Sequence, residues 1–264
     1  MKIGIIGLGN MAGAILNGML QKEIVKKEDV IGSAATEATV KRAAQQYGIE
    51  TTLDNRKVAE MADVLILAVK PQFMADVIGQ IKDCVSENTL MITIAAGKPI
   101  KWYEEAFGKS IKLVRCMPNT PAMVGEGCTA VCVNENVTQQ EQAQALELME
   151  SFGKTCVIRE GLMDAFSAIA GSSPAYVFMF IEAMADAGVA AGMPRAQAYE
   201  AVAQSVMGSA KLMLESGKHP GELKDMVCSP GGTTIQGVKK LEENGMRGAV
   251  MSAIAACVEK AKQL

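Results

Sequence analysis

Short runs of Ile, Val, Leu and Met alternate with longer helix-like stretches over the first 158 residues. The runs are continuously apolar instead of alternating with polar residues, which is typical of strands in a sheet covered on both faces. They predict strands at 2–7, 30–33, 63–69, 89–95, 111–117 and 129–133. The stretches between them predict helices at 11–20, 39–47, 72–85 and 138–152. Repeated strand–helix units predict an α/β fold with a Rossmann-type, doubly wound and mainly parallel sheet.

The pattern changes near residue 160, after which no strand-like run occurs. The rest of the chain is rich in Ala, Met and Glu and has a helical character. Breaks that contain Gly, Pro or Asn-Gly divide it into successive helices, at 171–174, 192–194, 217–221, 229–232 and 244–245. A length of 264 residues agrees with two domains, at about 150 residues for each domain. We therefore predict an α/β domain at 1–158 and an all-helical domain at 159–264.

The helical half is unusually apolar. Residues 165–181 carry no charge, so a membrane span is one interpretation of this segment. A Gly-Ser-Ser-Pro break at 171–174 interrupts them, and Glu182 and Asp186 follow at once, which favours a pair of buried helices. Together with 183–193, they offer more apolar surface than a domain of about 100 residues buries alone. We expect this face to be buried in a homo-oligomer, the alternative being that it packs on the chain's own N-terminal domain.

Composition and charge narrow the classes of partner. Lys and Arg number 26 against 29 Asp and Glu, so the net charge is −3, and no block of like charge occurs. Aromatic residues make up 4% of the chain, which leaves little material for stacking on bases. Neither a nucleic acid nor a membrane is indicated as a partner. The chain starts with an apolar strand pattern instead of a signal peptide, so we expect a cytoplasmic protein.

The residues that most often hold metals are scarce or scattered. The seven cysteines include no Cys-x-x-Cys pair, and His219 is the single histidine. We therefore predict no bound metal. Scattered cysteines in odd number are interpreted as reduced, buried thiols of a cytosolic protein. His219 stands in a Gly-Lys-His-Pro-Gly break and is interpreted as a loop residue instead of an acid–base group.

The first chemical motif is Gly7-Leu8-Gly9-Asn10-Met11-Ala12, which matches G-x-G-x-x-G/A. It follows the first predicted strand and opens a helix, the context in which such a loop binds a dinucleotide. Gly7 permits the tight turn, Gly9 lets the backbone approach a pyrophosphate, and Ala12 keeps the helix close to the strand. Free N–H groups at the helix N-terminus attract phosphate. The alternative interpretation is a glycine-rich turn without a ligand.

The second predicted strand ends at Ser33, where an NAD site would carry Asp or Glu for the ribose hydroxyls. No carboxylate stands there to repel a 2′-phosphate, and Ser33 and Thr36 can donate hydrogen bonds. Lys41 and Arg42 follow on the next helix. NADPH is therefore favoured as the cofactor, with NADH as the alternative because Glu37 is near in sequence. The basic pair has a second interpretation as a solvated helix face.

Three further strand ends meet the same edge of the sheet, where ligands of such folds bind. Ala68-Val69-Lys70 ends one strand, and we favour a positioning or surface role for Lys70 over that of a catalytic base. Ala95-Ala96-Gly97 and Met117-Pro118-Asn119 end the next two strands. Their small residues and amide groups suit a flat nicotinamide ring, and the simpler interpretation of the prolines is that they turn the chain.

Five segments together resemble pyrroline-5-carboxylate reductase, and the resemblance runs from end to end. They are Gly7-x-Gly9-x-Met11-Ala12, Ala68-Val69-Lys70-Pro71-Gln72, Arg115-x-Met117-Pro118-Asn119-Thr120-Pro121, Gly171-x-Ser173-Pro174-Ala175-Tyr176 and Ser229-Pro230-Gly231-Gly232-Thr233-Thr234. The last segment is the most specific, because generic dinucleotide-binding enzymes lack it. That family reduces the cyclic imine 1-pyrroline-5-carboxylate to L-proline with NADPH or NADH, the last step of proline synthesis. One departure is Ser172-Ser173, where spellings such as Gly-Ser-Gly-Pro are common.

The resemblance implies a role for each segment. It implies that the cofactor lies on Gly7–Ala12, with Ser33 and Thr36 near the adenosine ribose. It implies further cofactor contacts from Asn55, Ala68, Val69, Lys70, Ala95, Ala96, Gly97, Asn119 and Pro174. It implies that the substrate carboxylate binds at Ser229, Gly231, Gly232, Thr233 and Thr234, with Thr234 as the candidate catalytic residue. In the family this loop comes from the partner subunit of an intertwined dimer, often gathered into larger rings, so a homodimer is implied.

The reaction suits this inventory of residues. A protonated imine is electrophilic at carbon, so hydride can arrive without a metal or a covalent nucleophile. A rival is a dehydrogenase of the β-hydroxyacid or 6-phosphogluconate type, which needs a catalytic Lys on a helix of the second half. No Lys lies between Ser173 and Lys211, which argues against that class. A second rival is a nucleotide-sensing protein, in which NADPH would bind and no imine would be reduced.

Overall fold

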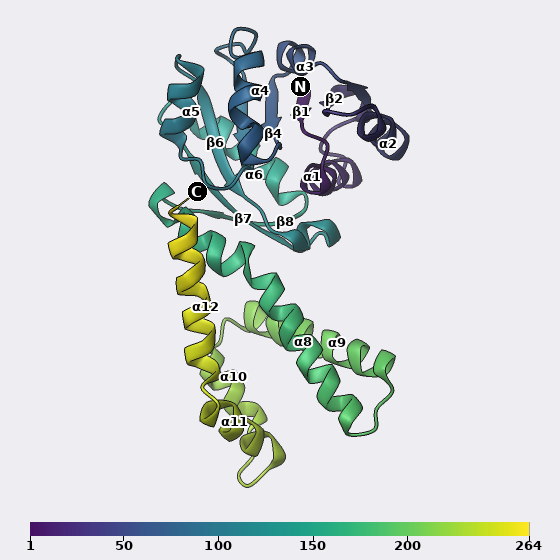
Figure 1. The fold of residues 1–264 in the computed structure, drawn as a ribbon, viewed down its shortest axis with the longest axis vertical. Helices are drawn as coiled ribbons and strands as arrows, with labels where there is room; N and C mark the ends of the chain where they lie inside the picture. Colours follow the sequence, from purple (N-terminus) through teal and green to yellow (C-terminus); the bar gives the residue numbers. More distant parts are fainter. Residues whose placement is uncertain (264) are drawn as a thin grey trace. The chain divides into compact units, whose positions relative to one another are not determined.

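A computed structural model describes residues 1–263 of the chain, which form two compact units. The first unit holds residues 1–171 and the C-terminal residues from 258 onward, and the second holds residues 172–257. Both units are drawn in Figure 1.

The first unit is built on one eight-stranded sheet with the order β3-β2-β1-β4-β5-β6-β7-β8. All neighbouring strands are parallel except β6 and β7, which are antiparallel. The strands are β1 (Ile3–Ile6), β2 (Val30–Ser33), β3 (Glu50–Thr52), β4 (Val64–Leu67), β5 (Leu90–Thr93), β6 (Lys112–Met117), β7 (Gly127–Val133) and β8 (Gly153–Val157). The prediction of a doubly wound, mainly parallel sheet is confirmed.

Helices cover both faces of this sheet, as Figure 1 shows. The α-helices of the unit are α1 (Asn10–Gln21), α2 (Glu37–Tyr47), α3 (Asn55–Met61), α4 (Met74–Ile81), α5 (Ile100–Phe107), α6 (Gln139–Glu150) and α7 (Met163–Phe166). Shorter turns are the 3₁₀ segments η1 (Lys27–Asp29), η2 (Pro71–Phe73), η3 (Thr120–Val124) and η4 (Glu160–Leu162), and the π-helix η5 (Ser167–Gly171). One core joins the sheet to α1, α2 and α6, and a second joins it to α3, α4 and α5. Buried apolar side chains on both faces explain why the strands lack alternation.

The sequence pattern missed four elements of this unit. β3 and β8 are edge strands whose residues, Glu-Thr-Thr and Gly-Lys-Thr-Cys-Val, are polar or half exposed, so no apolar run marks them. Helix α3 has two buried positions, Val58 and Ala59, and begins where the Asp54 side chain accepts a hydrogen bond from the Arg56 amide. Helix α5 likewise falls between two predicted strands. Short elements of this kind carry too few periodic positions to be recognised.

The second unit contains only helices among the residues that the structure describes. They are α8 (Ser173–Ala190), α9 (Arg195–Ser216), α10 (Pro220–Val227), α11 (Thr233–Glu243) and α12 (Met246–Ala261), the last of which continues past residue 257 into the first unit. The predicted break at 171–174 marks the start of α8, and the other four breaks mark the boundaries between successive helices. Gly217 closes α9 in the left-handed conformation that favours glycine. The segment 159–171 packs with the first unit, because Met163 and Ala168 are buried there and the Asn119 amide donates to the carbonyl of Ala170 at 3.0 Å.

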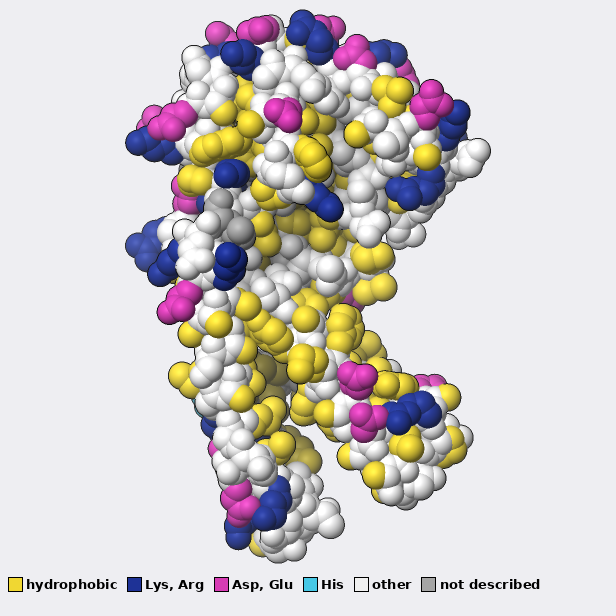
Figure 2. Space-filling view, in the orientation of Figure 1, with side chains coloured by type: hydrophobic (Ala, Val, Ile, Leu, Met, Phe, Trp, Pro, Cys, Tyr) yellow, Lys and Arg dark blue, Asp and Glu magenta, His cyan; other side chains and the backbone are white. Residues whose placement is uncertain are grey.

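Helix α8 exposes most of its apolar side chains within one chain. Phe178 is 65% exposed and Met179 is 68% exposed, and Ala185 is the buried position of the helix. Figure 2 shows apolar side chains gathered over the helices of the second unit. The helical run Glu160–Ala190 is long and apolar enough to cross a membrane by length and composition, with a mean hydropathy of 1.3. An apolar face of this extent needs a covering partner.

Candidate functional site

The glycine-rich loop joins β1 to α1 and has the geometry of a dinucleotide-binding turn. Gly7 has φ +100°, and a Cβ at this position would lie 2.8 Å from the carbonyl carbon of Ala68. Its amide donates to the Ser33 carbonyl at 2.9 Å. Only glycine meets both the positive φ and the close approach to β4. The strands β1, β2 and β4 therefore meet at this turn.

The N-terminus of α1 is open to a ligand. Gly9 is the N-cap residue and no side chain caps the helix, so the first N–H groups have no side-chain acceptor. A Cβ on Gly9 would meet no atom within 4 Å. Ala12 is buried against the core, Leu8 is buried, Met11 is half-buried and Asn10 is exposed. Unsatisfied donors and open space in front of them fit a pyrophosphate.

The hydroxyl of Ser33, at the end of β2, forms a hydrogen bond with a neighbouring side chain. It is fully buried, and its hydroxyl donates to Oδ1 of Asn55 at 2.7 Å. The Asn55 amide in turn donates to Oε1 of Gln80 at 2.8 Å. The structure therefore brings two of the predicted cofactor residues together and adds Gln80, which the sequence did not single out. The hydrogen bonds from Ser33 and to Gln80 hold the Asn55 side chain in one orientation.

The start of α2 carries the other groups predicted near the adenosine end of the cofactor. Thr36 is the N-cap of α2, and its hydroxyl accepts from the Thr39 amide. Lys41 forms an exposed ion pair with Glu37 at 2.9 Å. Arg42 forms no hydrogen bond or ion pair with any residue from 1 to 263. It lines a groove of about 360 Å³ that also reaches Leu8, Gly9 and Asn10, so its charge is available next to the glycine-rich loop.

The carboxyl ends of β4 and β5 supply the next predicted residues. The amide of Ala68 donates to the Ile6 carbonyl at 2.8 Å, which ties this strand end to β1. Ala68 and Val69 are half-buried, and Lys70 is exposed. In the turn after β5, Ala95 is buried, Ala96 is half-buried and Gly97 has φ +81°. Small residues at both ends leave room for a flat ring above the sheet.

Asn119, which follows β6, is buried, and its side chain forms hydrogen bonds with two other segments of the unit. Its Oδ1 accepts from the Cys128 amide at 2.8 Å, and its Nδ2 donates to the Ala170 carbonyl at 3.0 Å. These two bonds join the start of β7 to the end of η5. Both polar atoms of the side chain thus have a partner in the protein, and the second N–H of Nδ2 and the backbone remain for a contact of Asn119 with the cofactor.

Two thiols of this unit, Cys116 and Cys132, are buried and are poor nucleophiles, whereas Cys156 is exposed, so the prediction of buried cysteines is wrong for that residue. Burial raises the pKa of the Cys116 thiol far above its ordinary value, and burial raises the pKa of Cys132 to about 11. Both thiols therefore stay protonated at neutral pH. All seven cysteines are free, and no group of three or more metal-ligating side chains occurs within residues 1–263.

The Ser229–Thr234 segment of the second unit forms an uncapped helix start. Gly231 has φ +70°, and the Gly232 amide donates to the Ser229 carbonyl at 3.0 Å, which closes a tight turn. Gly232 is the N-cap of α11, and no side chain caps this helix. The hydroxyls of Ser229, Thr233 and Thr234 are exposed. The arrangement offers N–H donors and hydroxyls to one anion.

Pro174 lies in the first turn of α8, where a missing N–H costs nothing. Two residues on, the Tyr176 hydroxyl lies 2.7 Å from Sγ of Cys257 on α12. This hydrogen bond raises the pKa of Tyr176. Pro174 and the predicted cofactor loop belong to different units, so the predicted contact of Pro174 with the cofactor stays a prediction.

Sequence reasoning assigned no role to two polar pairs of side chains near the predicted nicotinamide turns. Arg115 on β6 pairs with Glu160 on η4 at 2.8 Å, and the hydroxyls of Thr93 and Tyr103 lie 2.7 Å apart in the core. Arg115 belongs to one of the segments that carry the family resemblance, and its charge inside an apolar strand run is a further signal, but neither indicates its partner. Its partner lies 45 positions away, which no local pattern reveals.

Two family models match the chain. One, described as pyrroline-5-carboxylate reductase dimerisation, matches residues 160–264. The other, described as NADP oxidoreductase, coenzyme F420-dependent, matches residues 2–97. The two matched ranges fall in the helical and in the α/β part of the chain.

Similar proteins cover the whole chain. The pyrroline-5-carboxylate reductase of Escherichia coli strain K12 is 47% identical over 263 residues, with 100% of this chain and 98% of that protein aligned. The solved pyrroline-5-carboxylate reductase of Coxiella burnetii gives a TM-score of 0.93 at 34% identity, covering 99% of this chain and 97% of the other. The Plasmodium falciparum pyrroline carboxylate reductase, solved with NADP bound, gives a TM-score of 0.90 at 35% identity, covering 100% and 97%.

Proposed function

Since the chain belongs to the pyrroline-5-carboxylate reductase family, we propose that its glycine-rich loop holds NADPH and that its Ser229–Thr234 segment binds the substrate carboxylate. The protein is an NAD(P)H-dependent oxidoreductase that reduces 1-pyrroline-5-carboxylate to L-proline, the last step of proline biosynthesis, with NADPH as the cofactor. The observation that carries the residue assignment is the pair of open helix starts, at Gly9 and at Gly232.

In the α/β domain, different residues bind different parts of the cofactor. The N–H groups after Gly9 bind the pyrophosphate, because the helix start is open and positively polarised. Asn55, oriented by Ser33, faces the adenosine ribose, and the unpaired Arg42 attracts the 2′-phosphate. The Ala68–Lys70 turn lies along the ribose of the nicotinamide half, and the turns at Ala95–Gly97 and Met117–Asn119 hold the nicotinamide ring. When bound, the cofactor supplies the hydride, and these residues supply its orientation.

On the helical side, the residues bind and polarise the imine. The backbone N–H groups of Gly231 and Thr233 and the hydroxyl of Ser229 hold the carboxylate, which fixes the ring of the substrate. The Thr234 hydroxyl donates a hydrogen bond to the ring nitrogen, which gains electron density as the carbon accepts hydride. Donors aimed at developing charge in a site of fixed geometry stabilise the transition state. Thr234 is therefore the proposed catalytic residue.

The protein is a homo-oligomer that acts on a small molecule. We propose that the apolar face of α8 is buried against a second copy, that the partner's loop completes each site, and that dimers can gather into a larger ring. The break at 171–174 and the acidic residues Glu182 and Asp186 support a protein interface over a membrane for this run. We further propose a cytoplasmic location, and a functional division between residues 158 and 159. The match of the dimerisation model from residue 160 supports that boundary.

Purified protein tests the proposed function directly. NADPH absorbance is followed with and without 1-pyrroline-5-carboxylate, and formation of proline is measured in parallel. The proposal expects stoichiometric oxidation of NADPH and appearance of proline, with no oxidation when the imine is left out. Binding of NADPH without turnover would identify a nucleotide sensor instead.

Cofactor choice gives a first prediction at the residues after β2. Ala35 is exposed beside the predicted ribose site, whereas Ser33 is buried, so an added carboxylate reaches the cofactor from position 35. Ala35→Asp is expected to lower kcat/KM for NADPH by about ten- to a hundredfold, because it repels the 2′-phosphate, and to leave NADH within about threefold. Ala38→Asp, the second residue of α2, adds the same charge outside the segment 33–36 and serves as the control. Equal losses with both cofactors would contradict this placement.

A further inference from the structure

One carboxylate oxygen joins three segments of the first unit. Oε1 of Glu160, the first residue of η4, accepts from Nη1 of Arg115 at 2.8 Å and from the backbone amide of Ile100 at 2.7 Å. Arg115 lies on β6 and Ile100 is the first residue of α5. Pro99, the N-cap of α5, offers no side-chain hydrogen bond, so Glu160 caps this helix from a distance.

The ion pair is largely removed from solvent. The Arg115 side chain is 9% exposed and that of Glu160 is 34% exposed. Arg115 is in register with Thr93 of β5 on one side and with Cys132 of β7 on the other. A guanidinium in such a position depends on its partner, because a lone buried charge is strongly unfavourable. The pair therefore holds its three segments in one arrangement.

These three segments adjoin the two turns assigned to the nicotinamide. Ile100 follows the Ala95–Gly97 turn closely in sequence, and Arg115 precedes Met117 at the end of β6. A small cavity of about 30 Å³ is lined by the Ala95–Gly97 turn, Arg115 and Met117, among others. The guanidinium thus lies beside both turns.

A second polar pair supports the same turn from the core. The Ala95 amide donates to the Thr93 hydroxyl at 3.4 Å, and that hydroxyl lies 2.7 Å from the hydroxyl of Tyr103 on α5. Burial raises the pKa of Tyr103, and the Thr93 hydrogen bond and the Arg115 charge act in the opposite direction. Helix α5 is therefore held to the strand ends at its first turn by Glu160 and further along by Tyr103.

We propose that Arg115 and Glu160 form a positioning pair that fixes the Ala95–Gly97 turn against the end of β6, and so sets the approach of the nicotinamide ring to the imine. This inference rests on the proposed function, since it takes these turns as the nicotinamide site. Neither side chain needs to touch the substrate. The pair acts through the backbone of the two turns, and a shift of about 1 Å between reacting atoms is enough to slow a reaction by about a hundredfold.

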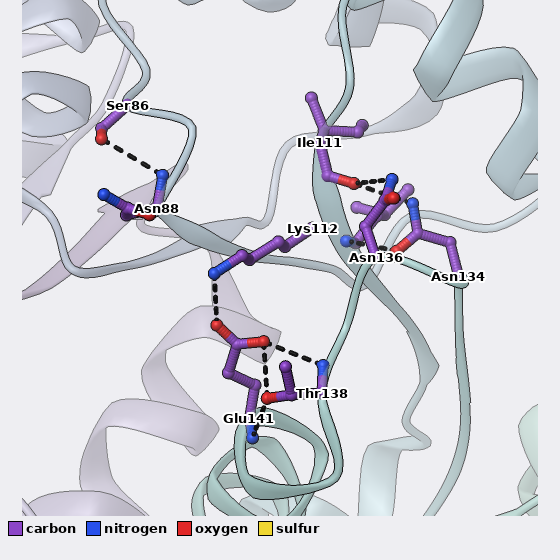
Figure 3. A network of polar contacts seen from close by, with 9 residues as sticks. Ser86, Asn88, Ile111, Lys112, Asn134, Asn136, Thr138 and Glu141 are labelled. Carbon is purple, nitrogen blue, oxygen red and sulfur yellow. Dashed lines mark hydrogen bonds and ion pairs between the residues drawn. The ribbon is translucent and has the colours of Figure 1, made fainter.

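The same strand offers a matched ion pair away from the turns. Lys112, at the other end of β6, pairs with Glu141 at 2.6 Å, and both side chains are about equally shielded, at 24% and 20% exposed. Figure 3 shows Glu141 also accepting from the amide and hydroxyl of Thr138, where it completes the cap of α6. Burial acts to raise the pKa of Glu141, and the hydrogen bonds from Lys112 and Thr138 outweigh it and lower the pKa. Lys112→Met thus removes a comparable pair at the amino end of the strand.

The experiment compares Arg115→Met, Glu160→Gln and Lys112→Met in the full-length oligomer. Amide hydrogen exchange without cofactor is measured over residues 94–102, and NADPH binding is measured by fluorescence. Steady-state rates are measured with NADPH and with NADPH deuterated at the transferred position. Arg115→Met is expected to speed exchange over 94–102 at least about tenfold and to lower kcat about thirty- to three-hundredfold, with NADPH affinity within about threefold. The isotope effect on kcat should rise, because hydride transfer becomes rate-limiting.

The controls separate positioning from stability alone. Lys112→Met should lower the melting temperature and leave exchange over 94–102, kcat and the isotope effect at wild-type values. Glu160→Gln keeps an acceptor for Ile100, so it should fold and show a smaller loss of kcat in the same direction, which keeps the test valid if Arg115→Met does not fold. Wild-type exchange and kcat in a folded Arg115→Met or Glu160→Gln protein would overturn the inference. An inactive wild-type protein would overturn the proposed function instead.

Discussion

Replacing Thr234 by valine should lower kcat/KM for the imine by about ten- to a thousandfold, the range for one donor to a developing charge. The substitution keeps the shape of the side chain and removes the hydroxyl proposed to donate to the ring nitrogen. Thr234 is exposed and the start of α11 has no side-chain cap, so the melting temperature should change little. NADPH affinity should stay near the wild-type value, because the proposed cofactor groups lie in the other unit. Steady-state kinetics, fluorescence binding and thermal unfolding measure the three quantities.

Thr138→Val provides the contrast for this variant. Thr138 is a true helix cap, since its hydroxyl accepts from the Glu141 amide and the Glu141 side chain accepts from the Thr138 amide. Its loss should cost about 1 kcal/mol of stability and leave kcat/KM unchanged. If Thr234→Val instead shows normal turnover and a lower melting temperature, the Ser229–Thr234 segment is only a helix cap. The substrate carboxylate would then bind elsewhere.

The double substitution of Phe178 and Met179 by glutamate should convert the oligomer into monomers and abolish most of the activity. Both side chains are more than 60% exposed within one chain, at 65% and 68%. Burial of such a side chain contributes about 1.5–3 kcal/mol, and a two-fold interface counts each side chain twice. Glutamates in the same place would instead bury unpaired charges. Light scattering and kcat measured on the same samples check both parts of the prediction.

Met61→Glu serves as the control for this surface. Met61 ends α3 in the first unit and is 41% exposed, so it tests the effect of an added charge on an exposed methionine outside α8. The control should remain oligomeric and active. A fully active monomer of the Phe178 and Met179 variant would contradict the proposal that a neighbouring chain completes the site.

Much of the fold could be predicted because both faces of the sheet are buried. Strands such as β4 and β5 consist entirely of buried residues, and they appear in the sequence as unbroken apolar runs. The edge strands β3 and β8 lie where the sheet ends, and polar residues are tolerated there, so the same rule misses them. The helix breaks were recognised because Gly, Pro and Asn-Gly act locally on the backbone.

The candidate site was predictable in its loops and less so in its side chains. Gly7 was recognised because the turn demands its positive φ, and Gly9 because a residue without a side chain leaves open space in front of the helix start. The side-chain hydrogen bonds of these candidates form between residues that meet only after folding. Ser33 bonds to Asn55, and Asn119 bonds to Cys128 and Ala170. The pairing of Arg115 with Glu160 is of the same kind. Hydrogen-bond partners that lie far apart in the sequence leave no periodic signal. Sequence reasoning therefore identifies candidate site residues but not the hydrogen bonds that their side chains already make within the protein.

The central claim is that each site combines the glycine-rich loop of one chain with the Ser229–Thr234 loop of its partner, and mixed oligomers test it most directly. Gly9→Asp should fold, because a Cβ at Gly9 meets no atom within 4 Å, and its carboxylate should block the pyrophosphate. This chain and a Thr234→Val chain are co-expressed with different tags, and particles that carry both tags are isolated. If the loops are exchanged, one of the two sites in a mixed dimer is intact, and activity should return to about half of the wild-type value although each parent is nearly inactive. A mixed oligomer as inactive as its parents would show that each loop serves its own chain and would contradict the claim.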